Sequence, residues 1–134
     1  MSKSILFVCQ SCRATHTDSP DCPSEGMILL KHLLDLSRLN SQLSELEIQP
    51  VGCLWTCDRP CAIALSSSHK STYMLANISI TENLEEAAEA ILQLCQLYLE
   101  SQDGNIPWKK FPDVLQTDTV ARIPPLIPSV ANEA

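Results

Sequence analysis

The chain has 134 residues, of which 45% are hydrophobic and 19% charged, a composition typical of one soluble globular domain. Nine basic and sixteen acidic side chains leave a net charge of −7, which argues against nucleic acid or an anionic membrane as the main partner. The apolar run at residues 5–8 is too short for a signal peptide or a membrane span, so we expect no membrane insertion and a cytoplasmic location.

The first half of the chain predicts a strand, a helix and a second strand. Residues 4–8 form an apolar run with β-branched and aromatic members, which indicates a buried strand ending at Cys9. Residues 25–39 have helical periodicity, and residues 46–51 alternate as a half-buried strand does. The predicted buried face of the helix consists of Met27, Leu30, Leu33 and Leu34.

The next segment predicts a hairpin and a long helix. Residues 62–65 and 72–78 are two strands joined by the polar turn 66–71. Residues 79–82 have the spacing of a capping box, and Asp103 with Gly104 ends the helix that this box opens. Its predicted buried face consists of Leu84, Ala87, Ala88, Ile91, Leu94, Cys95 and Tyr98.

Strand, helix, strand, hairpin and helix make an α/β fold in the thioredoxin-like order, which we assign to residues 1–103. Residues 104–134 contain five prolines, which exclude a long helix or a central strand there. The apolar side chains in this region predict an extended Pro-rich segment that packs on the domain and frays after Pro128.

Cysteines carry the functional signal. Six of the seven lie between residues 9 and 61: Cys9, Cys12, Cys22, Cys53, Cys57 and Cys61. Thiolates are the soft ligands that iron–sulfur clusters and zinc select. Since cytoplasmic thiols stay reduced, such grouping indicates a metal or redox site rather than structural disulfides. The seventh, Cys95, repeats the buried stripe of the long helix, and we expect it in the core.

The cysteine spacing resembles that of the thioredoxin-like [2Fe-2S] ferredoxins. Twelve residues separate Cys9 from Cys22, thirty separate Cys22 from Cys53, and three separate Cys53 from Cys57. In that family one cysteine follows the first strand, one precedes the first helix, and a C-x3-C pair follows the second strand. The resemblance implies that Cys9, Cys22, Cys53 and Cys57 bind a [2Fe-2S] cluster.

A second resemblance runs from about Ile5 to Pro125. An uncharacterised bacterial family of predicted metal-binding proteins has a Val-Cys-x-x-Cys-Arg start, a Cys-Leu-x-x-Cys-x-Arg-Pro-Cys centre, a Lys-x-Thr-Tyr hairpin, and Pro-Trp and Arg-x-Pro-Pro in its tail. This chain has them at residues 8–13, 53–61, 70–73, 107–108 and 122–125. That pattern emphasises Cys12 and Cys61, which are therefore alternate ligands.

We expect a small iron–sulfur protein, either a ferredoxin-like electron carrier or an iron or redox sensor, rather than an enzyme. Its acidity suits a redox partner protein with a basic surface. The sequence does not determine whether the protein also forms a homodimer. Two alternatives come from the same cysteines. One is a thiol-disulfide oxidoreductase that uses Cys9 and Cys12, and the other is an interaction module stabilised by a four-thiolate zinc site.

Overall fold

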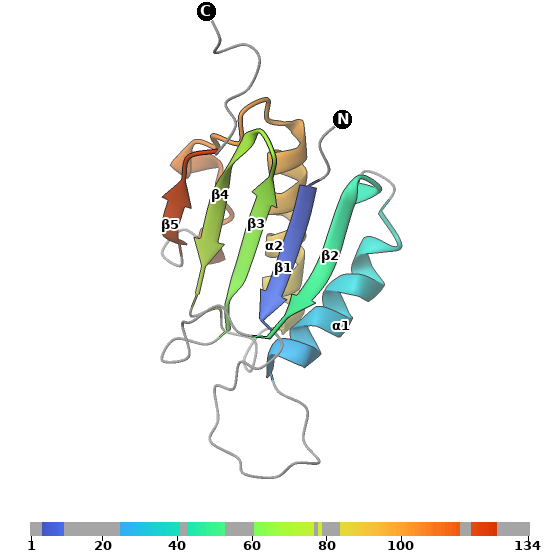
Figure 1. Ribbon diagram of the computed structural model, residues 1–134. Helices are drawn as coiled ribbons and strands as arrows, with labels where there is room; N and C mark the ends of the chain where they lie inside the picture. Colours follow the sequence, from blue (N-terminus) through green and yellow to red (C-terminus); the bar gives the residue numbers. More distant parts are fainter. Residues whose placement is uncertain are drawn as a thin grey trace, which may run out of the picture.

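A computed structural model describes residues 4–9, 25–40, 43–52, 61–76, 78, 84–115 and 119–125. These residues form a mixed five-stranded sheet, ordered β2-β1-β3-β4-β5, and two α-helices (Figure 1). The elements in chain order are β1 (Ser4–Cys9), α1 (Glu25–Ser37), β2 (Leu46–Val51), β3 (Ile63–Ser67), β4 (Lys70–Leu75), α2 (Leu84–Glu100) and β5 (Thr119–Ile123). The predicted α/β class is confirmed. None of the helices in these ranges is long and apolar enough to cross a membrane.

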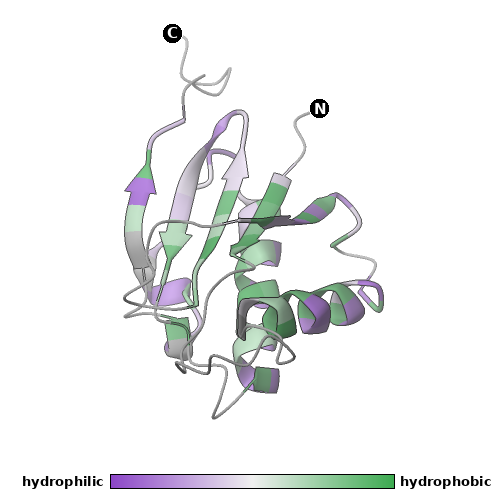
Figure 2. Ribbon diagram, turned by 60° about the horizontal axis from the view of Figure 1, so that its bottom comes forward, coloured by the Kyte–Doolittle hydropathy of each residue, from purple (hydrophilic) through white to green (hydrophobic). Residues whose placement is uncertain are grey.

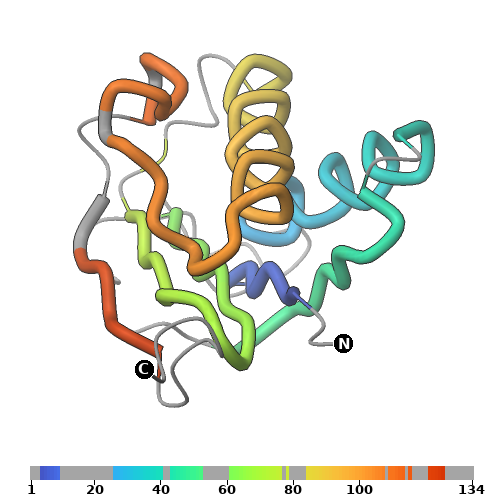
Figure 3. The backbone as a smooth tube through the Cα atoms, turned by 90° about the horizontal axis from the view of Figure 1, so that it is seen from above, coloured from blue at the N-terminus to red at the C-terminus, as the bar shows by residue number. Residues whose placement is uncertain are grey.

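Both helices lie on the same face of the sheet, as the view along the strands shows (Figure 3). The core fills the space between the helices and the sheet, with Leu6 and Val8 of β1 completely buried. Strand β1 is also the most uniformly hydrophobic strand (Figure 2). Leu29 of α1 and Ile91 of α2 reach the same core. The result is two layers, with helices on one side of the sheet.

The buried face of α1 differs from the predicted one. Leu29 and Leu33 are completely buried, whereas Met27 is 49% exposed, so the prediction of Met27 as a core residue is wrong. Leu30 packs against the core as a partly buried side chain. Residues 27–30 are all apolar, so several faces of the helix satisfy the 3.6-residue period equally well. Packing against the sheet and α2 then selects among them.

Two strand predictions also needed correction. The hairpin is tighter than expected, because β3 and β4 extend to Ser67 and Lys70 and leave only Ser68 and His69 in the turn. Strand β5 was not predicted, and it pairs antiparallel with β4 at the sheet edge. An edge strand tolerates neighbouring prolines because one side of its backbone needs no strand partner. In the described part of residues 104–134, the one strand is β5, and it lies at the edge of the sheet rather than in its centre.

A cluster of polar contacts ties the hairpin to the carboxyl end of α2. The Lys70 ammonium donates to the carbonyl oxygens of Tyr98 at 2.7 Å and Leu99 at 3.3 Å. The buried Tyr98 hydroxyl donates to the Ser71 carbonyl at 2.6 Å. A cation that caps the last carbonyls of a helix also interacts favourably with the helix dipole. Burial lowers the pKa of Lys70, although Coulombic attraction to Glu45 opposes this shift.

The same cluster holds the segment that follows α2. The Ile106 amide donates to the Tyr73 hydroxyl at 2.9 Å, and the Phe111 ring meets Tyr73 edge-on at 5.6 Å between centroids. Gly104 makes the turn with a φ of 78°. Part of the predicted Pro-rich segment thus packs on the helix side of the sheet. Everything after Pro125, including the expected fraying after Pro128, lies outside the described residues.

Gly104→Ala should lower the free energy of unfolding by about 2–4 kcal/mol, because a Cβ combines left-handed strain with overpacking. The added Cβ would lie 2.7 Å from both Lys70 Cβ and Ser71 N. Gly52→Ala is the matched control, since its Cβ meets no described atom within 4 Å, and we expect a change within about 0.5 kcal/mol. Urea unfolding measures both, and equal effects would contradict the packing at Gly104.

Candidate metal centre

Two described cysteines, Cys9 and Cys61, lie at the end of the sheet where β1 and β2 finish and β3 starts. Strands β1 and β2 run parallel, with Cys9 opposite Val51, so their carboxyl ends lie together (Figure 1). Cys53 follows Val51 by two positions in the sequence. Strand β3 runs antiparallel to β1 and therefore begins at this same edge, just after Cys61. We call this end of the sheet, marked by Cys9, Val51 and Cys61, the cysteine edge.

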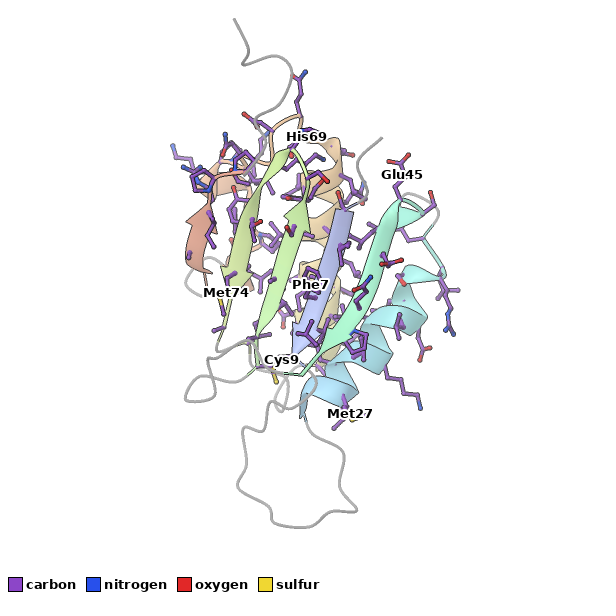
Figure 4. The ribbon with its side chains drawn as sticks, viewed as in Figure 1. Phe7, Cys9, Met27, Glu45, His69 and Met74 are labelled. Atoms are coloured by element: carbon purple, nitrogen blue, oxygen red, sulfur yellow. The ribbon has the colours of Figure 1, made fainter. Side chains whose placement is uncertain are left out.

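Backbone hydrogen bonds place Cys61 next to the residue that pairs with Cys9. The Cys9 amide donates to the Ala62 carbonyl at 3.1 Å, which continues the β1–β3 pairing beyond the first residue of β3. Cys61 in turn exchanges two backbone hydrogen bonds with Ile78, at 3.4 and 3.1 Å. These hydrogen bonds fix both backbones, although Cys9 is the last residue of β1 and Cys61 lies just before β3. Figure 4 shows Cys9 at the tip of β1.

Both cysteines are withdrawn from water. Cys9 is 2% exposed and Cys61 is 1% exposed, and both belong to the continuous core. A thiolate in such surroundings needs a metal or a cationic neighbour, because burial alone favours the neutral thiol. Helices α1 and α2 both begin at this edge, so the positive ends of their dipoles lie near it (Figure 1). Cys9 and Cys61 are two buried donors of the type that a thiolate-bound metal group uses.

The remaining predicted ligands cannot be compared with the geometry. Cys22, Cys53 and Cys57, as well as the alternate Cys12, lie outside the described residues. Of the four ligands that the ferredoxin resemblance implies, only Cys9 is described. Within the described ranges there is accordingly no group of three or more His, Cys, Asp or Glu side chains suited to a metal ion. The ligand set therefore stays a prediction.

Cys95 occupies the place that the sequence predicted for it. It lies on α2 with 1% of its surface exposed, within the same core cluster as Ile91 and Leu94. Burial raises the pKa of its thiol well above the ordinary value. An inert, protonated thiol is a packing residue rather than a metal ligand or nucleophile.

Sequence reasoning missed the part that Lys70 plays at the opposite end of the molecule. Its side chain anchors α2, whose first turn lies at the cysteine edge, so it orients the helix from its far end. The Lys-x-Thr-Tyr pattern marked this position, but a pattern of residue types does not reveal which carbonyls an ammonium will meet. Such a contact depends on the packing of α2 against the hairpin.

A family model described as "Protein of unknown function (DUF1636)" matches residues 6–125. The match covers the cysteine edge, both helices and β5. It agrees with the second resemblance drawn from the sequence, whereas the resemblance to thioredoxin-like ferredoxins stays a prediction. Comparison with curated proteins and with solved structures gave no match.

The buried Cys95 thiol should make the fold sensitive to alkali. As the pH rises above the ordinary thiol pKa of 9.0, the unfolded chain releases a proton that the folded chain retains, so stability falls. Urea unfolding at a series of alkaline pH values should show a shallower loss in Cys95→Ala than in the unmodified protein. Identical pH profiles for the two proteins would contradict the assignment.

Proposed function

We propose that this chain, which belongs to the DUF1636 family, is a small [2Fe-2S] protein that passes single electrons between protein partners or senses iron or redox state. The proposed ligands are Cys9, Cys22, Cys53 and Cys57, with Cys12 and Cys61 as alternates. The observation that carries the proposal is the cysteine edge. There the ends of β1 and β2 and the start of β3 meet, and Cys9 and Cys61 are buried.

A thioredoxin-like fold is part of this proposal. The parallel pair β1–β2 connected through α1, followed by the antiparallel hairpin β3–β4 and by α2, supports it. In open α/β sheets, ligands bind at the carboxyl ends of the parallel strands. That rule favours the cysteine edge over the hairpin end as the functional site.

A bound [2Fe-2S] cluster supplies one-electron chemistry, and the chain's own residues determine how it is held and reached. Cys9 would offer its thiolate from a backbone that β2 and β3 fix on both sides. The apolar neighbours of Cys9 and Cys61 exclude water from the sulfurs, which influences the reduction potential. Backbone rigidity and dryness together reduce the reorganisation that accompanies electron transfer.

The charge of the molecule suits a basic redox partner. A cluster core of about +2 bound by thiolates totalling about −4 deepens the acidity of a chain whose net charge is already −7. Glu85 and Glu86 are exposed on the first turn of α2, which begins at the cysteine edge. Opposite charge on a partner would raise the association rate and orient this edge toward it.

The burial of Cys9 restricts the thiol-disulfide alternative to a mechanism in which Cys12 is the attacking thiol. In that mechanism Cys9 or Cys12 must attack a substrate disulfide, and an attacking thiolate has to be accessible. Cys9 is only 2% exposed. A zinc site is distinguished by metal analysis rather than by geometry, because zinc and iron–sulfur clusters select the same thiolates.

Anaerobically purified protein should be coloured and should contain about two irons and two sulfides per chain. Cys9→Ser should abolish the visible absorbance and the bound iron, since it removes a ligand. Cys95→Ser is the matched control, and it should keep the spectrum while losing about 1–3 kcal/mol of stability through a buried hydroxyl. A colourless, iron-free protein would refute the cluster, and stoichiometric zinc or a metal-free dithiol active on insulin disulfides would favour an alternative.

The fourth ligand has its own test. If Cys22 binds the cluster, Cys22→Ser should bleach the protein, whereas Cys12→Ser and Cys61→Ser should keep its spectrum. Since Cys61 is buried next to the Cys9 backbone, Cys61→Ser should instead lower the unfolding temperature. If Cys22→Ser keeps its spectrum, Cys22 is not the fourth ligand. The fourth ligand is then Cys12 or Cys61, whichever of the two bleaches the protein when it is changed to serine.

A further inference from the structure

The sheet face turned away from α1 and α2 combines apolar and polar side chains. Both helices lie on the other face, where Leu6 and Val8 are completely buried (Figure 3). Because side chains alternate along a strand, Ile5 and Phe7 point away from the helices. Strand pairing and one side-chain hydrogen bond align a row of residues across this face, which we call the mixed row: Glu47, Ile5, Ser66, Thr72 and Ile123.

A hollow of about 480 Å³ lies over the mixed row. Ile5 and Phe7 line it from β1, and Ile123 and Pro125 line it from the end of β5 and the residues that follow. Strands β1 and β5 are separated by three strand spacings, or about 14 Å. Pockets that bind small molecules typically have volumes of about 300–1,000 Å³ and mostly apolar walls. The hollow therefore has the size and the walls of a small-molecule site.

Hydroxyl groups lie between these apolar walls. The Ser66 and Thr72 oxygens are 3.0 Å apart and share one hydrogen bond, in which either can be the donor. Two hydroxyls carry two protons, so one proton of the pair is left to donate to another acceptor. The Ser67 hydroxyl, on a residue that also lines the hollow, is buried and has no partner in the described part of the chain. Since unpaired buried hydroxyls are costly, these groups favour a ligand with a hydrogen-bonding oxygen.

Charge selects for a neutral ligand. Of the described residues that line the hollow, Lys70 alone is charged, and its ammonium donates to the Tyr98 and Leu99 carbonyls of α2. Glu47 places a carboxylate at the β2 end of the mixed row, where it accepts a hydrogen bond from the Gln49 amide. Together with the net charge of −7, this carboxylate repels anions. An ammonium ligand is disfavoured as well, because it offers no acceptor for the spare hydroxyl proton.

We propose that this hollow is a binding site for a small neutral aromatic molecule that carries a carbonyl group. The aromatic ring lies between Phe7 on one wall and Pro125 on the other, where the Phe7 ring makes favourable stacked or edge-on contacts. The carbonyl oxygen accepts the spare proton of the Ser66–Thr72 pair. The inference does not depend on the proposed cluster, because the hollow lies at the hairpin end of the sheet and the cysteine edge at the opposite end (Figure 1).

Benzamide is the probe that tests the proposal, because it joins one aromatic ring to one neutral carbonyl group. In an NMR titration of the isotope-labelled full chain, the amide signals of Ser66, Thr72 and Ile123 should shift and saturate. The dissociation constant should be in about the millimolar range, as expected for a ligand of about nine non-hydrogen atoms. Benzoate has the same ring with a charged carboxylate, and it should bind more weakly.

Thr72→Val keeps the shape of the side chain and removes one hydroxyl of the pair, so it should raise the dissociation constant of benzamide about three- to tenfold. Ser44→Ala is the matched control, since it removes an exposed hydroxyl outside the hollow and should leave binding unchanged. Circular dichroism must show that each variant is folded. If Thr72→Val is not, Ser66→Ala removes the other hydroxyl of the pair and makes the same test.

Three results would overturn the proposal. The first is the absence of saturable benzamide binding, or binding that shifts only signals away from the hollow. The second is benzoate binding as tight as that of benzamide, which would contradict a neutral ligand. The third is unchanged benzamide binding in the folded hydroxyl variant, which would exclude the Ser66–Thr72 pair as the recognition group.

Discussion

Strand β1 hydrogen-bonds to β2 on one side and to β3 on the other, and this double pairing determines where the other described elements can lie. Because β2 is parallel to β1, the chain must cross back between them, and α1 makes that crossing. Because β3 is antiparallel, it begins where β1 and β2 end. The cysteine edge is therefore a consequence of strand direction.

The two ends of the molecule have different physical roles. At the hairpin end, Lys70 and Tyr98 join α2 to β4, and the Arg122 guanidinium donates to the Asn105 side chain across the turn after α2. These contacts are polar, specific and far from the cysteines. They orient α2 so that its first turn faces the cysteine edge. The family match spans both ends.

Periodicity predicted most elements because burial leaves a direct mark on sequence. The predicted residues of the α2 stripe from Ala87 to Tyr98 are buried, because glutamates and glutamines occupy the opposite face of the helix. Ala90 and Leu92, which were not predicted, are buried as well, and Leu84 is only partly buried. The face of α1 was wrong for the opposite reason, because residues 27–30 satisfy several faces and tertiary packing decides. Strand β5 was missed because an edge strand depends on its partner β4 rather than on its own pattern.

The site was predictable only in part. The sequence predicted that Cys9 ends a strand, and β1 does end there. That Cys61 lies beside the Cys9 backbone could not be predicted, because the contact arises from an antiparallel pairing across more than fifty positions of sequence. Residue types also did not show which side chains of β1 face the helices. The apolar run at residues 5–8 indicated a buried strand, yet only alternate members face the helices.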